Sequence, residues 1–226
     1  ALGVAIACAI VGFVIGTSSL TGLGLTISNN LVELAGGNVL LTLVLAMIGS
    51  LILGMGLPTT ANYIVTSTIV APALVKLGIL PIAAHMFVFY FGIIADITPP
   101  VCLAAFTGAG IAGASPAKTG LTATKLAIAA FILPYMFVYS PQLLLQNVTL
   151  GGMISILATS VIGIACVAGS TMGYFIINDN LLERILLLAS GLLMIKPGHT
   201  TDIIGFALAG IVVLWQLQRK KRQRNR

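Results

Sequence analysis

Charged residues are scarce in this sequence. Among its 226 residues, eleven are Lys or Arg and five are Asp or Glu, so charged residues make up 7% of the chain while hydrophobic residues make up 58%. A water-soluble domain of this length carries about a quarter charged residues. One water-soluble core cannot bury so much apolar surface, so the composition excludes a soluble globular domain. It indicates an all-α, polytopic membrane protein in a lipid bilayer, since helices satisfy their own backbone groups there.

Cysteine is also rare. Cys8, Cys102 and Cys166 each lie in an apolar run, and no C-x-x-C spacing occurs. The usual metal and redox motifs are therefore absent, and so is a phosphate-binding loop. We expect the cysteines to be small buried hydrophobes, and we expect no cofactor.

Basic residues are concentrated at one place. Six of the eleven Lys and Arg residues lie in the last eight residues, RKKRQRNR, and the other five are balanced by five acids. A basic tail directly after an apolar segment is typical of a cytoplasmic end. Nucleic-acid binding needs basic residues spread over a folded face, so we expect a cytoplasmic C-terminus and no nucleic-acid partner.

Apolar segments suited to membrane helices recur along the whole chain. They cover residues 1–16, 38–57, 61–78, 80–113, 119–139, 150–177, 181–195 and 202–217. The first lacks a basic n-region and a cleavage site, so we interpret it as a transmembrane helix at the edge of a fragment. We expect the polar segment 17–37 to be an interfacial arm or connector and SPAKTG (115–120) to be a loop. The short segment 181–195 either spans the membrane or lies in its interface.

Polar residues interrupt the chain between segments 38–57 and 61–78. A tight pair of full crossings is one interpretation of the sequence GMGLPTTANY there. A re-entrant hairpin, whose tip is buried in protein, is the other, and the many hydroxyl groups favour it because lipid offers them no partners. The residues of the predicted tip are Gly54, Gly56, Pro58, Thr59, Thr60 and Asn62.

Segment 80–113 is too long for one membrane-thick helix and has an interruption of its own. Pro99 and Pro100 disfavour helix in the residues before them. We therefore predict a broken helix, 81–96 and 101–113, joined by an unwound link. Asp96 in this region, alone or with Thr98, either caps the second half-helix or binds an ion or substrate, and both roles remain open.

Interrupted helices have a chemical consequence. Their last carbonyls and first N–H groups lose their partners, and discontinuous helices mark the binding sites of secondary transporters. Carbonyl, hydroxyl and carboxylate oxygens are hard ligands that suit Na⁺.

Enzymatic alternatives find little support. His85 shares a helix face with Asp96 but lies roughly 16 Å away, too far for an acid–base pair, so we interpret it as an interfacial residue. An intramembrane aspartyl protease needs two carboxylates on facing spans, and only Asp96 qualifies. A serine protease needs a base within reach of its nucleophile, and neither His85 nor His199 has an obvious serine partner. We therefore expect that this protein is not an enzyme.

Several motifs follow one another in the order of a known family. They are GMGLPTT, APALVKLG, HMFVFYF, TPPVCLAAF and AGASPAKTG. Over residues 1–145 the sequence resembles the large membrane subunit, or permease, of tripartite ATP-independent periplasmic (TRAP) transporters, in particular the fused permeases of the TAXI type. Residues 146–226 are similar to an additional C-terminal membrane region of such proteins.

The resemblance implies a multi-pass protein of the bacterial inner membrane that works by an elevator mechanism. Residues 1–145 then form the second of two inverted repeats, with hairpin 38–78 and broken helix 80–113, and the first repeat is missing from this sequence. The implied partners are a TAXI-type periplasmic solute-binding protein and a small membrane subunit or its fused equivalent. The implied link residues are Asp96, Ile97, Thr98, Pro99 and Pro100. The implied Na⁺ ligands are Gly56, Thr60, Asp96 and Thr98.

The function expected from this resemblance is Na⁺-coupled import of a small organic anion, a carboxylate. Two alternatives stay open. One is an H⁺-coupled transporter of the same architecture with Asp96 as the proton carrier. The other is a membrane scaffold subunit that does not transport.

Overall fold

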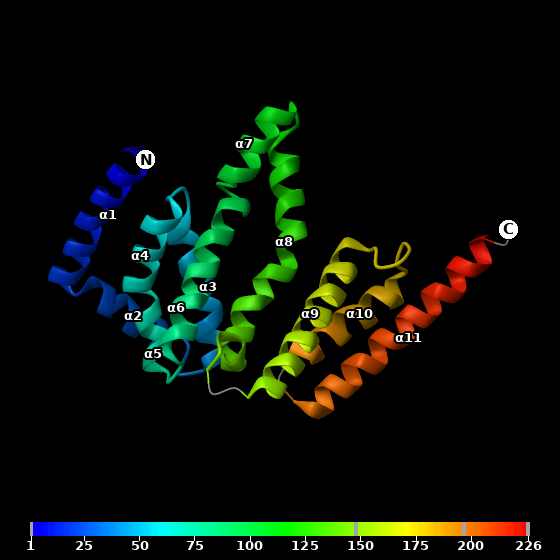
Figure 1. The fold of residues 1–226 in the computed structure, drawn as a ribbon. Coiled ribbons are helices and arrows are strands. Elements are labelled where there is room, and N and C mark those ends of the chain that lie inside the picture. Colours follow the sequence, from blue (N-terminus) through cyan, green and yellow to red (C-terminus); the bar gives the residue numbers. More distant parts are fainter. Residues whose placement is uncertain (1, 147–148, 196–197, 225–226) are drawn as a thin grey trace. The chain divides into compact units, whose positions relative to one another are not determined.

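The computed structural model describes residues 2–146, 149–195 and 198–224, and these residues form helices joined by short turns (Figure 1). The all-α fold predicted from the composition is therefore confirmed for the described residues. Ala1 and the last two residues of the basic tail, Asn225 and Arg226, lie outside them. The chain divides into two compact units, Ala1–Thr124 and Lys125–Arg226.

The first unit contains the predicted hairpin and the predicted broken helix. Its elements are α1 (Leu2–Thr21), α2 (Leu23–Leu34), α3 (Val39–Gly54), α4 (Thr59–Ile69), α5 (Ala71–Lys76), α6 (Pro81–Ile94), the short 3₁₀ helix η1 (Ala95–Ile97) and α7 (Leu103–Ala112). Helix α8 (Pro116–Tyr139) begins in this unit and continues into the second.

Helix α1 continues past the expected end at residue 16. The threonines there do not stop it, because their hydroxyls bond to carbonyls of their own helix: Thr17 Oγ1 donates to Phe13 O at 2.8 Å. The helix ends at Gly22, whose φ of 67° is left-handed. Beyond this turn α2 forms a 71° bend with α1, so the expected arm is itself helical.

Segment 38–78 folds as a helical hairpin. The side chain of Asn38 accepts a hydrogen bond from Leu41 N at 3.1 Å and caps α3. The chain then turns at 55–58 and returns as α4, which packs against α3. Helix α3 has 16 residues, and the returning leg is divided into α4, with 11, and α5, with 6, whereas a full crossing needs about 20 residues of helix. No single helix of this segment has that length, which agrees with the re-entrant interpretation.

Segment 80–113 is broken, as predicted. Helix α6 ends at Ile94 and α7 begins at Leu103, later than expected. The residue at the N-cap of α7 is Cys102, with φ 44° and no side-chain cap bond. The capping role considered for Asp96 and Thr98 is therefore wrong, because the two prolines delay the start of α7 and leave Asp96 inside η1.

The loop predicted for SPAKTG (115–120) is also wrong. Helix α8 begins at Pro116, a first helical position where proline is well suited because its missing N–H has no helical partner. The carbonyl of Ser115 accepts the first helical bond, from Thr119 N at 3.0 Å.

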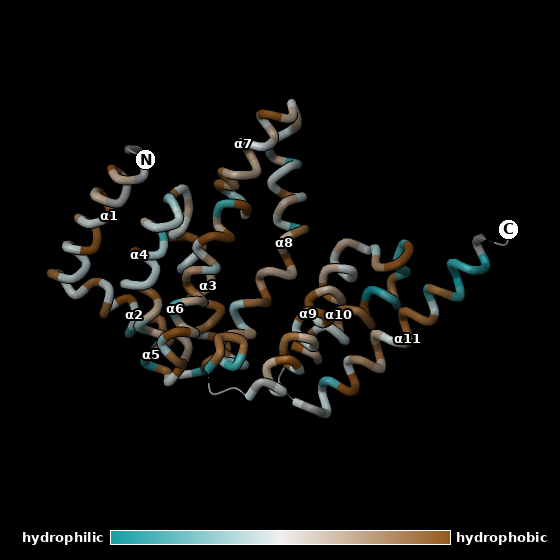
Figure 2. The backbone as a smooth tube through the Cα atoms, in the orientation of Figure 1, coloured by the Kyte–Doolittle hydropathy of each residue, from teal (hydrophilic) through white to brown (hydrophobic). Residues whose placement is uncertain are grey.

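The second unit is a bundle of helices. Beyond α8 its elements are the 3₁₀ helix η2 (Pro141–Leu144), α9 (Leu150–Met172), α10 (Leu181–Ile195) and α11 (His199–Arg224). Helix α10 has the bounds predicted from the sequence. Helix α9 ends at Met172, five residues before the predicted 177, and is followed by Gly173, whose φ of 73° is left-handed. Figure 2 shows α11 changing from hydrophobic to hydrophilic toward its end, so the described part of the basic tail is helical.

Glycines bring α9, α10 and α11 close together. A Cβ on Gly191 of α10 would lie 2.7 Å from the carbonyl oxygen of Gly163 in α9. Ser190 Oγ donates to the carbonyl of Gly205 in α11 at 2.7 Å. Small residues of this kind let membrane helices approach closely.

Three described helices have the length and apolar composition to cross a membrane, and the bent pair α1–α2 passes the same test as one broken span. The three are Pro116–Tyr139, Gly151–Met172 and Thr200–Arg222. The chain is therefore a polytopic membrane protein.

Candidate functional site

The side chain of Asn62 joins the hairpin to the broken helix. It lies on α4 and is 2% exposed. Its Nδ2 donates to the carbonyl of Gly92 in α6 at 2.7 Å, and more weakly to the carbonyl of Gly54, the last residue of α3, at 3.4 Å. We call Gly54, Asn62 and Gly92 the hairpin junction. One amide thus ties both hairpin legs to α6.

The two glycines make room for this amide. A Cβ on Gly92 would lie 2.5 Å from Asn62 Oδ1, and one on Gly54 would lie 2.8 Å from Asn62 Nδ2. Both distances are shorter than any normal van der Waals contact. The junction therefore closes only where both helices carry no side chain.

Buried oxygen atoms without partners occur on α3, α4 and η1. Among the described residues, Asn62 Oδ1, Asp96 Oδ1 and Ser50 Oγ are buried and have no hydrogen-bond partner. An unpartnered buried polar atom costs about 1–3 kcal/mol, and such atoms in native proteins commonly bond to water or an ion. They are candidate ligands for a small hard cation.

Two of these oxygens belong to residues that are each related to Gly92. Asp96 follows Gly92 by four residues, a rise of about 6 Å for helical geometry, and Asn62 contacts Gly92 directly. Gly92 thus accepts a hydrogen bond from Asn62 of α4 and precedes Asp96 of η1 by four residues in the chain. The described residues contain no group of three or more His, Cys, Asp and Glu side chains that could hold a metal ion.

Several backbone carbonyls in and next to the link accept hydrogen bonds from nearby residues. Thr98 Oγ1 donates to Ile94 O at 2.7 Å, and Thr98 O accepts a bond from Cys102 N at 3.3 Å. Thr124 Oγ1 of α8 donates to Ile97 O at 3.1 Å. Because a hydroxyl and a carbonyl each have two lone pairs, Thr98 Oγ1 and Ile97 O retain acceptor capacity for a cation.

The hairpin tip and the link share the wall of a small cavity. Its volume is about 180 Å³, and Met55, between the tip residues Gly54 and Gly56, lines it together with Thr98, Pro99 and Pro100. The other lining residues, from α3 and η1, are Ile48, Leu51, Ile52 and Ala95. This mostly apolar wall suits packing between tip and link better than it suits a hydrated ion.

The other predicted tip residues have different positions. Gly56 has a φ of 75° and is exposed, and Pro58 precedes α4 and accepts a bond from Asn62 N at 2.9 Å. Thr59 and Thr60 are exposed at the start of α4. In the part of the chain that the structure describes, no hydrogen bond joins these threonines to the link. Na⁺ binding by Gly56, Thr60, Asp96 and Thr98 stays a prediction.

Some residues of the site were missed in the sequence. Gly92 gave one usable clue, a glycine inside a long apolar helix one turn before Asp96, and Ser50 gave none. His85, expected at the interface, is half-buried, with its Nδ1 3.0 Å from Tyr63 Oη of α4. This contact makes His85 a second link between α4 and α6.

Comparison with known proteins identifies the family. Residues 1–151 match the family described as tripartite ATP-independent periplasmic transporter, DctM component. No curated protein and no solved structure gives a significant match. The match covers about two thirds of the chain, includes both interrupted elements and ends near the domain boundary expected at residue 145. That boundary stays a prediction, since the two compact units divide earlier, at Thr124. The chain therefore belongs to the family of the DctM component of tripartite ATP-independent periplasmic transporters.

Proposed function

We propose that this chain is part of a Na⁺-coupled permease that imports a small organic anion, a carboxylate. The family is one of transporters, not of enzymes, and its transporters are tripartite. The proposed partners are a periplasmic solute-binding protein of the TAXI type and a small membrane subunit or its fused equivalent. The proposed location is the bacterial inner membrane, with the C-terminus in the cytoplasm.

One observation carries the Na⁺ part of the proposal. Asn62 Oδ1 and Asp96 Oδ1 are both buried, lack partners among the described residues and belong to the two interrupted elements. Hard oxygen ligands favour an alkali or alkaline-earth cation over a softer metal, and a single carboxylate matches the single charge of Na⁺.

The coupling proposed here follows from the position of Asn62. Its Nδ2 bonds to the carbonyls of Gly54 and Gly92, while its Oδ1 is buried beside Gly92 and has no hydrogen-bond partner among the described residues. A cation shared by Asn62 and Asp96 favours the closed hairpin because it binds that state more tightly than the open one. The closed transport domain then slides across the membrane with its substrate, as an elevator.

Uptake measurements test the transport class. Proteoliposomes that contain the full-length permease and its partner subunits are given ¹⁴C-labelled mono- and dicarboxylates with the solute-binding protein. We expect uptake of at least one carboxylate under an inward Na⁺ gradient. Uptake driven by a pH gradient alone, and lost in Asp96→Asn, would instead support the H⁺-coupled alternative.

A hydroxyl substitution tests the ion site. Thr98→Ala removes one acceptor beside Asp96, and a ligand of this strength changes affinity about fivefold. We expect the Na⁺ concentration for half-maximal uptake to rise by that factor with unchanged protein abundance, and Thr60→Ala tests the tip in the same way. The matched control is Thr17→Ala, whose hydroxyl makes the same type of bond to its own helix far from the site along the chain. Unchanged Na⁺ dependence in Thr98→Ala would contradict the site.

A further inference from the structure

A network of polar side chains fixes the end of α11 against α10. Glu183 is 3% exposed, and its Oε1 forms an ion pair with Arg219 Nη1 at 3.1 Å. Its Oε2 accepts a bond from the backbone N of Asn180 at 2.8 Å. Gln216 is fully buried and donates to Asp179 Oδ1 at 2.6 Å. The charge of Glu183 is thus matched by Arg219, and Arg219 is held in place.

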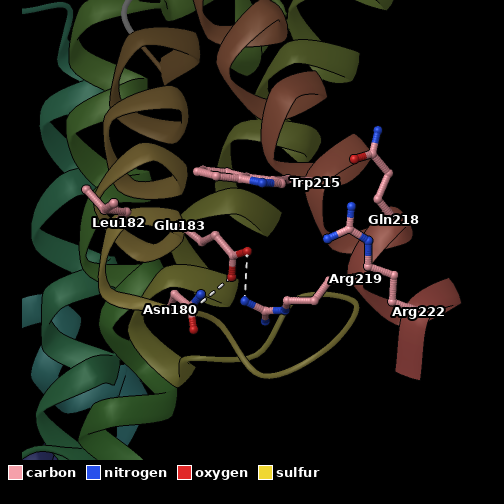
Figure 3. Close-up of a pocket in the computed structure, with 7 residues that line it drawn as sticks. All are labelled: Asn180, Leu182, Glu183, Trp215, Gln218, Arg219 and Arg222. Carbon is pink, nitrogen blue, oxygen red and sulfur yellow. Dashed lines mark hydrogen bonds and ion pairs between the residues drawn. The ribbon is translucent and has the colours of Figure 1, made fainter. Parts of the chain in front are cut away.

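A pocket of about 240 Å³ opens beside this ion pair (Figure 3). Its polar lining residues are Asn180, Glu183, Gln218, Arg219 and Arg222. Two arginines and one carboxylate leave a net charge of 2 − 1 = +1 in the lining. Arg222 has no ion-pair partner among the described residues, and Figure 3 shows its guanidinium on the side of Gln218 and Trp215. The pocket therefore has an unmatched guanidinium available to an anion.

The pocket lies at the border between the apolar and the basic part of α11. Leu214, Trp215 and Leu217 are 62%, 51% and 48% exposed, as expected of side chains that face lipid. The next residues, Arg219 to Arg222, are four consecutive basic residues. Tryptophan is enriched at the level of lipid headgroups. The phosphates of the bilayer are therefore expected at the depth of this pocket.

We propose that this pocket binds the phosphate group of an anionic phospholipid. Arg222 donates a forked pair of hydrogen bonds to the phosphate, a geometry that a planar guanidinium matches well. The amide of Gln218 supplies a further donor, and the exposed ring of Trp215 packs along the first carbons of an acyl chain. This inference concerns the second unit and does not depend on the proposed Na⁺ site.

Tryptophan fluorescence tests the proposal at the site itself. Trp215 is the single tryptophan of these 226 residues, and the signal of a Trp215→Phe variant corrects for tryptophans elsewhere in the full-length permease. The purified permease is titrated with phosphatidylglycerol whose acyl chains carry bromine, a quencher, and in parallel with brominated phosphatidylcholine. We expect phosphatidylglycerol to quench Trp215 at a lower mole fraction than phosphatidylcholine does, because the choline ammonium offsets the phosphate charge and the pocket lining is net positive.

Two single-charge variants separate the pocket from the tail as a whole. Arg222→Ala removes both the pocket charge and its charge-assisted hydrogen bonds to the phosphate, and we expect the preference for phosphatidylglycerol to fall at least twentyfold. Lys221→Ala removes a neighbouring charge that does not line the pocket, and we expect a fall of about fivefold, the effect of one basic residue at a membrane surface.

Three results would overturn the proposal. Equal losses in both variants would mean that the tail attracts anionic lipid diffusely. Equal quenching of the wild-type protein by the two lipids would mean that no anionic lipid is selected. Recovery of fluorescence on addition of millimolar inorganic phosphate would mean that the pocket takes soluble phosphate instead of lipid.

Discussion

At the scale of single residues, Asn62 has two competing tasks. Its amide nitrogen bonds to the carbonyls of Gly54 and Gly92, while its amide oxygen is buried without a partner among the described residues. A buried amide oxygen without a partner costs about 1–3 kcal/mol, and a bound cation would remove that cost. The proposed cation accounts for both halves of the side chain.

The fit between Asn62 and Gly92 yields a prediction. Gly92→Ala would place a methyl group 2.5 Å from Asn62 Oδ1, so the amide must leave its position. We expect the stabilisation of the purified full-length permease by NaCl over choline chloride, measured by thermal unfolding, to require at least tenfold more Na⁺. This loss corresponds to about 1.4 kcal/mol of binding free energy.

Gly108→Ala is the control for this substitution. It adds the same methyl group to α7, where no atom lies within 4 Å of the new Cβ, and we expect Na⁺ stabilisation to remain as in the wild type. If Gly92→Ala also behaved like the wild type, Asn62 would not be a ligand.

The hairpin junction could be predicted from the sequence only in part. The sequence identified Asn62 and Asp96 because polar residues in apolar segments stand out. It could not pair Asn62 with Gly92, since that contact joins residues thirty apart in the chain and depends on how α4 packs against α6. Thr60, a Na⁺ ligand implied by the family resemblance, lies exposed at the start of α4, and its role as a ligand stays a prediction.

At the scale of elements, two proline sites had opposite outcomes. Pro99 and Pro100 break the helix, as predicted, because they follow helical residues whose continuation they prevent. Pro116 was expected in a loop, yet it begins α8. Proline fits the first turn of a helix but breaks a helix interior. A proline in the sequence therefore does not show by itself whether a helix ends before it or begins at it.

The close approach of α9, α10 and α11 gives a prediction about stability. In Gly191→Ala the new methyl group would meet Gly163 O at 2.7 Å and Val167 Cγ2 at 2.6 Å. We expect the variant to lose about 1–3 kcal/mol, the usual cost of overpacking, seen as a lower midpoint of thermal unfolding in detergent.

Gly210→Ala provides the comparison on α11. Nothing lies within 4 Å of its added Cβ, and alanine has a higher helix propensity than glycine, so we expect an unchanged or slightly higher midpoint. Similar midpoints for Gly191→Ala and Gly210→Ala would contradict the packing described here.

At the scale of the whole molecule, composition alone established the class. A chain with 7% charged and 58% hydrophobic residues has few alternatives to the membrane, and the order of its motifs indicated the family. The division into two units could not be predicted from the sequence. It falls at Thr124, within the continuous helix α8, where no change in composition marks a boundary.

The orientation of the chain in the membrane is a prediction at this scale. The basic residues from Arg219 to Arg222 follow the apolar part of α11 directly, and such clusters stay on the cytoplasmic side. Green fluorescent protein fused after Arg226 should therefore fluoresce in cells, and alkaline phosphatase fused at the same place should be inactive. An active phosphatase with a dark fluorescent fusion would reverse the proposed orientation.

Direct ion binding is the measurement closest to the central claim, that oxygens from the hairpin and the broken helix together hold Na⁺. Equilibrium binding of ²²Na⁺ to the purified full-length permease compares the wild type with Asp96→Asn, which keeps the shape of the side chain and removes its charge. We predict that one Na⁺ site weakens at least tenfold in the variant. Identical ²²Na⁺ binding curves for the two proteins would contradict the claim.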